Sequence, residues 1–265
     1  MSNSSKIAWT DHTWNPTTGC SKDCSYCYAK SFATRMKCHP NPKIKHQYRN
    51  GFEPTCHEER LNIPGQWKNP KRIFVNSMGD LFDPAIPFVF VSRVMDIIEH
   101  HQQHTYQILT KQPERMKEFF DQHKWKFFDK TPDFVWLGVT VTNQQDADER
   151  IVPLVKTYAG KHFISAEPLL GPVDLGKEYI TLAAGLKRYP FKGLEDQYRT
   201  KLIDMLDWVI VGGETGHNAR HMQPEWVMDI KEQCEQSNTA FFFKSWGGKS
   251  KTEIIDGKEY KEFPK

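Results

Sequence analysis

Three cysteines near the start of the chain are the residues whose types and spacing most clearly indicate chemistry. Cys20, Cys24 and Cys27 form a C-x3-C-x2-C array. Loops this short would strain a disulfide, whereas three thiolates this close in sequence can converge on one metal or cluster. Structural zinc sites normally close with four ligands, so three cysteines leave one position open. An iron–sulfur cluster held by three cysteines would keep one iron free for a substrate, whereas electron-transfer clusters normally use four.

Other interpretations of the cysteines stay open from the residue types alone. The array can hold a structural zinc ion with a fourth ligand from His12, His39 or Cys56, or a cluster that serves electron transfer alone. The dipeptides Cys38-His39 and Cys56-His57 also offer four ligands to a separate zinc ion that would order the segment between them. Another cysteine, Cys234, lies on an apolar helical face and is expected in the core.

The array, with the aromatic Tyr26 just before its last cysteine, resembles the signature loop of radical S-adenosylmethionine (SAM) enzymes. This resemblance implies a 4Fe-4S cluster on Cys20, Cys24 and Cys27, whose open iron chelates the amino and carboxylate groups of SAM. One electron then cleaves SAM to methionine and a 5'-deoxyadenosyl radical, which abstracts hydrogen from the substrate. Three more segments resemble a radical-SAM-like family often found in bacteriophage genomes, and this resemblance covers most of the chain: Trp14-Asn15-Pro16, residues 74–82 and residues 211–214.

Length and composition set the outer bounds of the fold and its location. The 265 residues match a single (β/α) barrel, for which about 250 is typical. Hydrophobic residues make up 38% and aromatic residues 13%, which is enough for a core. No apolar run approaches the roughly 20 residues that span a bilayer, and the first residues lack a signal-peptide pattern. With three of six cysteines clustered, we expect a cytoplasmic protein with metal chemistry and no membrane contact.

Hydrophobic periodicity predicts strands that alternate with helices. The expected strands are residues 7–14, 72–76, 106–110, 134–141, 161–166, 207–211 and 239–243, and the expected helices are residues 28–36, 88–98, 113–120, 147–158 and 224–234. Pro and Gly make residues 38–72 an irregular insertion, and residues 174–201 are expected to be a second insertion with short helices. The pattern predicts an α/β fold, a single domain over residues 1–265 with a mainly parallel sheet. The arrangement expected is a partial (β/α)6 TIM-like barrel with an additional C-terminal strand. No Gly-rich phosphate loop follows the first strand, which weakens the Rossmann and Walker alternatives.

Polar residues follow nearly every expected strand. In a (β/α) barrel the carboxyl ends of the strands surround one mouth, so these residues are expected to converge on a single site. Each of them taken singly can instead cap the next helix.

The resemblance to radical SAM enzymes implies roles for the residues at these strand ends. Tyr26 stands where that family packs a residue near the adenine, and Gly79 and Asp80 match the place of the glycine-glycine-glutamate motif that receives the SAM ammonium group. The triplet here is Met78-Gly79-Asp80, so the match is by place and partial chemistry. The expected SAM-binding residues are Tyr26, Ser77, Met78, Gly79, Asp80, Thr140, Thr142, Asn143, Ser165 and Glu167.

Charged residues at the remaining strand ends are left for the substrate. Lys111, Glu214 and Lys244 are the candidate catalytic residues, and Arg220 is a candidate for binding a phosphate or carboxylate. An ion pair between Lys111 and Glu214 across the mouth is the alternative.

A local basic segment suggests one class of substrate. Formal charge is +3, from 36 basic and 33 acidic residues, but residues 37–49 are basic with interleaved His and Tyr. Such a segment can follow a phosphate backbone, which makes Lys43 and Lys45 candidate substrate-binding residues, unless this is simply a solvated loop.

The phage association of the resembled family makes a nucleic acid or nucleotide the leading substrate, with SAM and an electron-donor protein as further partners. The alternatives are a radical SAM enzyme acting on a peptide or small molecule, and a zinc-stabilised nucleic acid binding protein without catalysis. Cys56 can alternatively donate hydrogen to a product radical, as a cysteine does in spore photoproduct lyase, another radical SAM enzyme.

Overall fold

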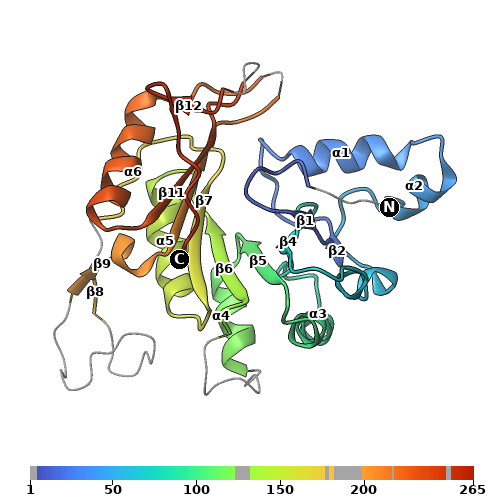
Figure 1. Cartoon of the computed structure of the whole chain (residues 1–265). Helices are drawn as coiled ribbons and strands as arrows, with labels where there is room; N and C mark the ends of the chain where they lie inside the picture. The colour runs from blue at the N-terminus through green and yellow to red at the C-terminus, as the bar shows by residue number, and fades with distance from the viewer. Residues whose placement is uncertain (1–4, 123–131, 177–178, 182–198, 217, 249–251) are drawn as a thin grey trace.

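A parallel sheet of seven strands is the centre of the protein. The computed structural model describes residues 5–122, 132–176, 179–181, 199–216, 218–248 and 252–265. The strands are β1 (His12–Thr13), β4 (Arg72–Val75), β5 (Thr105–Thr110), β6 (Val135–Thr140), β7 (Lys161–Ala166), β10 (Trp208–Gly212) and β11 (Ala240–Ser245). Their order in the sheet follows their order in the chain, and neighbouring strands pair in parallel. The sheet curls into a half-barrel (Figure 1).

This strand order confirms the prediction of an α/β protein with a parallel sheet. A doubly wound sheet reverses its strand order at a switch point, whereas this sheet never reverses. The first strand is shorter than expected, because residues 7–11 form turns before β1. The edge of β11 is covered by the C-terminal segment, where the Phe243 N–H donates to the Tyr260 carbonyl at 2.8 Å.

Four helices cover one face of the sheet. They are α3 (Phe88–His100), α4 (Pro113–Gln122), α5 (Gln144–Val155) and α6 (Pro224–Gln236). Their buried side chains share one core with alternate residues of the strands, such as Ile73, Val75, Val209 and Val211. Alternation is expected because successive side chains of a strand point to opposite faces. Pro153 lies inside α5, near the end of that helix.

The other face of the sheet carries aromatic rings. Phe74, Phe163, Trp208 and Phe242 form a second buried cluster there together with Trp9. Gly138 makes room for one of these rings, because a Cβ at this position would lie 2.4 Å from Phe163 Cζ. The rings fill the lower part of the half-barrel, so that open space remains at the carboxyl ends of the strands.

The first expected insertion contains more regular structure than its sequence indicated. Residues 38–72 hold α2 (Pro42–Gln47), β3 (Thr55–Cys56), η1 (Glu58–Arg60) and η2 (Pro64–Gln66), and β3 pairs antiparallel with β2 (Thr17–Thr18). Helix α2 has no buried residue and therefore no hydrophobic period, but Asn41 caps it and Pro42 is its first residue. With α1 (Tyr28–Lys37) it forms a projection that we call the arm, residues 28–52, beyond β1 and β2 in Figure 1.

The second expected insertion lies partly outside the described residues. Its described part contains β8 (Tyr179–Thr181) and β9 (Arg199–Lys201), which pair antiparallel, and η3 (Leu202–Met205) follows. Where the chain is described, this insertion therefore contains a strand pair in place of the expected short helices. Residues 182–198 lie outside the described residues. A small hairpin of β12 (Ile254–Ile255) and β13 (Lys258–Glu259) comes near the C-terminus.

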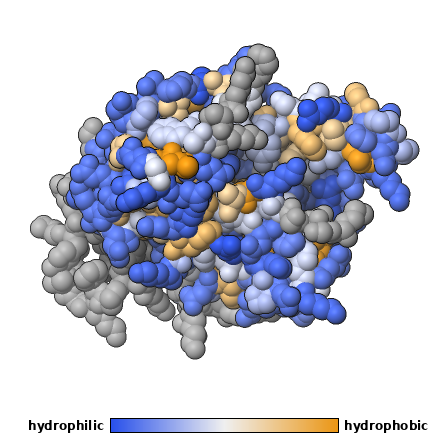
Figure 2. Space-filling model, turned by 45° about the horizontal axis from the view of Figure 1, so that its top comes forward, coloured by the Kyte–Doolittle hydropathy of each residue, from blue (hydrophilic) through white to orange (hydrophobic). Residues whose placement is uncertain are grey.

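The surface of the protein is mainly polar. Figure 2 shows hydrophilic side chains over most of the visible face. In the part of the chain that the structure describes, no helix has the length and apolar character needed to cross a membrane.

Replacing Trp208 by alanine tests the aromatic cluster. Trp208 is fully buried, and its ring contacts those of Trp9, Trp136, Phe163 and Phe242 at centroid distances of 5.8–6.1 Å. We expect Trp208→Ala to lower the free energy of unfolding by about 3–5 kcal/mol in urea titrations, because it leaves a cavity. The control Val89→Ala, at a side chain on α3 that is 71% exposed, should change it by less than about 0.5 kcal/mol. Equal effects of the two substitutions would contradict this account.

Candidate functional site

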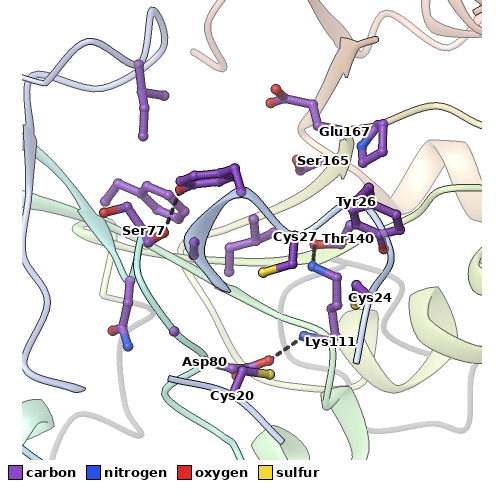
Figure 3. Close-up of a pocket in the computed structure, with 18 of the residues that line it drawn as sticks. Cys20, Cys24, Tyr26, Cys27, Ser77, Asp80, Lys111, Thr140, Ser165 and Glu167 are labelled. Atoms are coloured by element: carbon purple, nitrogen blue, oxygen red, sulfur yellow. Dashed lines mark hydrogen bonds between the residues drawn. The ribbon is translucent and has the colours of Figure 1, made fainter. Parts of the chain in front are cut away.

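A cavity of about 440 Å³ lies at the carboxyl ends of the strands. This volume falls within the range of about 300–1,000 Å³ that is usual for small-molecule sites. Thirteen of the residues expected at the site line it (Figure 3): Cys20, Cys24, Tyr26, Cys27, Ser77, Gly79, Asp80, Lys111, Thr140, Ser165, Glu167, Glu214 and Lys244. The structure therefore brings together the cysteine array and the ends of six strands.

Two glycines fix the cysteine loop against the loop that follows β4. The Gly19 N–H donates to the Met78 carbonyl at 2.8 Å, and a Cβ on Gly79 would lie 2.7 Å from the Gly19 oxygen. Gly19 itself has a φ of +83°, and a Cβ there would lie 2.2 Å from the Glu53 carbonyl oxygen. Gly79 thus permits a backbone-to-backbone contact that positions the cysteines. This structural role does not depend on a ligand.

The three thiols border the cavity from one loop (Figure 3). Cys20 Sγ accepts a hydrogen bond from the Lys22 N–H, and Cys27 Sγ accepts one from the Lys30 N–H, each at 3.4 Å. Cys27 is also the N-cap of α1, whose first turn has no acidic residue. Burial, together with nearby Asp80 and Asp83, raises the pKa of the Cys20 thiol to about 12. Among the residues that the structure describes, no three His, Cys, Asp or Glu side chains are placed to hold a single metal ion.

Asn15 and Asn76 order the loop between β4 and Asp80. Asn15 Oδ1 accepts from Met78 N at 2.9 Å and from Ser77 Oγ at 3.2 Å. Asn76 lines the cavity and is buried, and its Nδ2 donates to Thr17. Its Oδ1 is buried with no hydrogen-bond partner in the described structure.

Asp80 joins the ends of β4 and β5. Its Oδ1 accepts from Thr110 Oγ1 at 2.7 Å and from the Phe82 N–H at 3.0 Å, and its Oδ2 accepts from the Lys111 N–H at 2.9 Å. Burial raises the pKa of this carboxyl above its ordinary value, although the three hydrogen bonds oppose that effect. A carboxylate has about four lone-pair sites, so one acceptor site remains for a ligand.

The hydroxyl and carboxylate groups of β6 and β7 face the cavity in register. Thr140 lies opposite Ser165 in the paired strands. One residue past β7, Glu167 Oε1 accepts from Trp9 Nε1 at 3.0 Å, and its other oxygen forms an ion pair with the Lys244 ammonium. Glu167 and Lys244 therefore hold each other at the mouth.

Thr142 and Asn143 are placed differently from the expected SAM-binding position. Thr142 Oγ1 donates to Asp146 Oδ2 at 2.6 Å, and Asn143 is the N-cap of α5, accepting from the Asp146 N–H at 3.0 Å. The structure thus gives both residues the helix-capping contacts that the sequence left as the alternative. Met78 and Arg220 also do not contribute to the lining of this cavity.

The cations at the mouth are arranged around Tyr26. Lys111 Nζ lies 5.9 Å from the centre of the Tyr26 ring and donates to Thr140 Oγ1 at 3.3 Å. Glu214 pairs with Arg220, whose Nε donates to Glu214 Oε2 at 2.6 Å and whose Cζ also lies 5.9 Å from that ring. The sequence left open an ion pair between Lys111 and Glu214. In the structure Glu214 pairs with Arg220 instead.

The two Cys-His dipeptides have separate surroundings. Cys38 is exposed at the end of α1, and the ring of His39 accepts from the Asn41 N–H. The buried His57 contacts Thr18 Oγ1 at 2.8 Å, next to Cys56 in β3. Lys43 and Lys45 are exposed on α2, and Cys234 is buried in α6, as expected for a core residue.

Several lining residues were given no role from the sequence, among them Trp9, Lys22, Phe52, Asn76 and Thr215. The position of Asn76 carried a signal, because it lies two residues after Phe74 and so on the same face of the strand. Phe52 carried none, since it reaches the cavity through the return of the arm, where Cys20 N donates to the Phe52 carbonyl.

Replacing Asp80 by asparagine tests its linking role. The NH2 group of Asn would face an N–H or O–H donor, so we expect Asp80→Asn to lower the free energy of unfolding by about 1–3 kcal/mol. Urea titration followed by tryptophan fluorescence measures this. The control Asp229→Asn, at an exposed position on α6, should stay within about 0.5 kcal/mol of the unchanged protein. Full stability of Asp80→Asn would show that the three hydrogen bonds do not matter.

Comparison with known proteins places the chain in a family. No curated protein and no solved structure matches it. A family model described as "Protein of unknown function (DUF5131)" matches residues 4–264, which is nearly the whole chain. The protein therefore belongs to the DUF5131 family.

Proposed function

We propose that this protein is a radical SAM enzyme built on a partial (β/α)6 TIM-like barrel, with β11 as its additional strand. One observation carries the proposal. The three cysteines of the C-x3-C-x2-C array line the same cavity as the polar ends of six strands. A zinc site that merely stabilised the cysteine loop would not need these groups around it.

The cysteine loop has the donor set for a 4Fe-4S cluster with one open iron. Cys20, Cys24 and Cys27 would hold it, and the N–H bonds to two of the sulfurs are of the kind that tune iron–sulfur clusters. A cluster spreads its cysteines over separate irons, whereas one zinc ion needs every ligand within about 2.3 Å of a point. Three thiols that border one cavity from one loop are the ligands that such a cluster needs.

The residues around the cluster site can bind and orient SAM. With an electron from a reduced donor protein, the cluster would supply the one-electron cleavage of SAM to methionine and a 5'-deoxyadenosyl radical. The remaining acceptor site on the Asp80 carboxylate can receive the ammonium group. The Thr140 and Ser165 hydroxyls can bind the ribose, and the Tyr26 ring can pack on the adenine.

The aromatic floor of the cavity protects a reactive species. Trp9, Phe74 and Leu109 line the cavity from the buried cluster below it. These side chains exclude water from below, so that reactants approach from the mouth. Lys111 and the Lys244–Glu167 pair stand at that mouth and can position a substrate or move a proton at its edge.

Iron and sulfide analysis after anaerobic reconstitution tests the cluster. We expect about four irons per chain in the unchanged protein and a loss of most of this iron in Cys20→Ala, Cys24→Ala and Cys27→Ala. Cys38→Ala is the matched control, because Cys38 is an exposed cysteine outside the cavity, and it should keep its iron. Electron paramagnetic resonance of the reduced protein should change when SAM is added.

The opposite result is equally clear. One zinc per chain without sulfide, or an iron content that Cys38→Ala lowers as much as Cys24→Ala, would exclude the proposed cluster.

Replacing Thr140 by valine tests the SAM pocket. The change keeps the shape and removes one hydroxyl, so we expect SAM binding to the reconstituted protein to weaken about two- to tenfold. Isothermal titration calorimetry measures it. The control Thr105→Val changes the same residue type at the opposite end of the sheet and should leave the affinity unchanged. Unchanged affinity in Thr140→Val would remove this hydroxyl from the pocket.

A further inference from the structure

The arm carries charge of one sign. Residues 28–52 contain six Lys or Arg residues and no Asp or Glu, whereas the whole chain has 36 basic and 33 acidic residues. Lys37, Lys43, Lys45 and Arg49 are exposed, and the described structure gives none of them an ion pair. Unpaired cations of this kind attract a polyanion.

Internal contacts hold the arm together as a unit, while most of its cations form no ion pair in the described structure. The rings of Phe32 and Tyr48 meet edge to face at 5.8 Å between the two helical segments. Lys30 pairs with Asp23, and Arg35 lies over the Phe32 ring. Helix α1 buries just Ala29 and Ala33, and α2 buries no residue. The two helices of the arm therefore bury little surface, and hydrophobic packing gives no reason for their presence.

Both ends of the arm are at the cavity. Tyr28 and Ala29 at its start and Phe52 at its end line the cavity with the cysteines. The ammonium groups of Lys22 and Lys111, also lining residues, form no ion pair in the described structure, although Lys111 lies near Asp80. Cations thus lie both on the arm and at the cavity that the two ends of the arm reach.

Aromatic rings occur at the mouth of the cavity. Tyr26 and Phe52 line the mouth, and Tyr28, which is 57% exposed, donates its hydroxyl hydrogen to the Ser77 carbonyl. Cations that follow a backbone combined with rings that stack on bases are typical of single-strand nucleic acid sites. An acidic protein would match the cations but would have no use for the rings or for entry into the cavity.

We infer that the arm binds single-stranded nucleic acid through its phosphates and leads one nucleotide into the cavity. This inference rests on the proposed function for its reaction, since it names the substrate class of that site. A cavity of about 440 Å³ admits no duplex. An enzyme that acts on a base must therefore take it from a single strand or out of the stack.

Binding of labelled oligonucleotides to the full chain tests the inference. The probes are RNA and single-stranded DNA of about 20 nucleotides, longer than the roughly 4–16 that one small single-strand module covers, and the matching duplex. The arm variant replaces Lys37, Lys43, Lys45 and Arg49 by Gln. The control replaces four exposed lysines outside the arm and the cavity by Gln: Lys68, Lys156, Lys258 and Lys265.

We expect single strands to bind more tightly than the duplex. The slope of log affinity against log salt concentration is negative, and its magnitude should be smaller by about 3 in the arm variant. Each of the four lost phosphate contacts contributes about 0.7 to that magnitude. The control variant has the same change in net charge and should keep the slope of the unchanged protein. Circular dichroism and thermal melting of each variant show whether it is folded.

Two outcomes would overturn the inference. One is an unchanged salt slope in the folded arm variant. The other is displacement of the oligonucleotide by polyglutamate at equal charge concentration, which would indicate an acidic protein partner instead. Binding is also measured with Cys24→Ala, which should retain it. Arm-dependent binding by an unchanged protein that takes up no cluster would refute the proposed enzyme alone. A reconstituted cluster without arm-dependent binding would refute the nucleic acid inference alone.

Discussion

The alternation of side chains along parallel strands is the constraint on which the structure depends. Ile73, Val75, Val209 and Val211 pack beneath the helices, and Phe74, Trp208 and Ile210 point to the opposite face. Because every strand runs in the same direction, the aromatic residues gather at one level and the polar residues that follow them gather at another. The cavity is therefore a consequence of the same pattern that builds the two cores.

The cysteine loop is added to this framework by contacts of its backbone. Gly19 and Gly79 touch without side chains between them, and Asn15 ties the loop after β4 to the segment that precedes the cysteines. The Asp80 carboxylate extends the connection to β5. These contacts set the thiols beside the strand ends, and this is the arrangement that a cluster with an open iron would require.

Charge is distributed unevenly over the parts of the site. Within the mouth, Glu167 is matched by Lys244 and Glu214 by Arg220. The arm pairs Lys30 with Asp23 but leaves Lys37, Lys43, Lys45 and Arg49 without an ion pair in the described structure, although it begins and ends at the same cavity. The paired charges stabilise the shape of the mouth, and the unpaired cations of the arm can attract an anionic partner.

The sequence by itself determined the α/β alternation, the seven strands and thirteen of the residues that line the cavity. It did so because buried strands and amphipathic helices have distinct periods, and because polar residues after parallel strands meet at one edge. Tertiary structure alone decided between a ligand-binding and a capping position for Thr142 and Asn143, and paired Glu214 with Arg220 rather than Lys111. It also brought in Trp9 and Phe52 and formed α2 where the sequence shows no hydrophobic period. Contacts of this kind join residues that are distant in sequence or lack a buried face, so local patterns do not encode them.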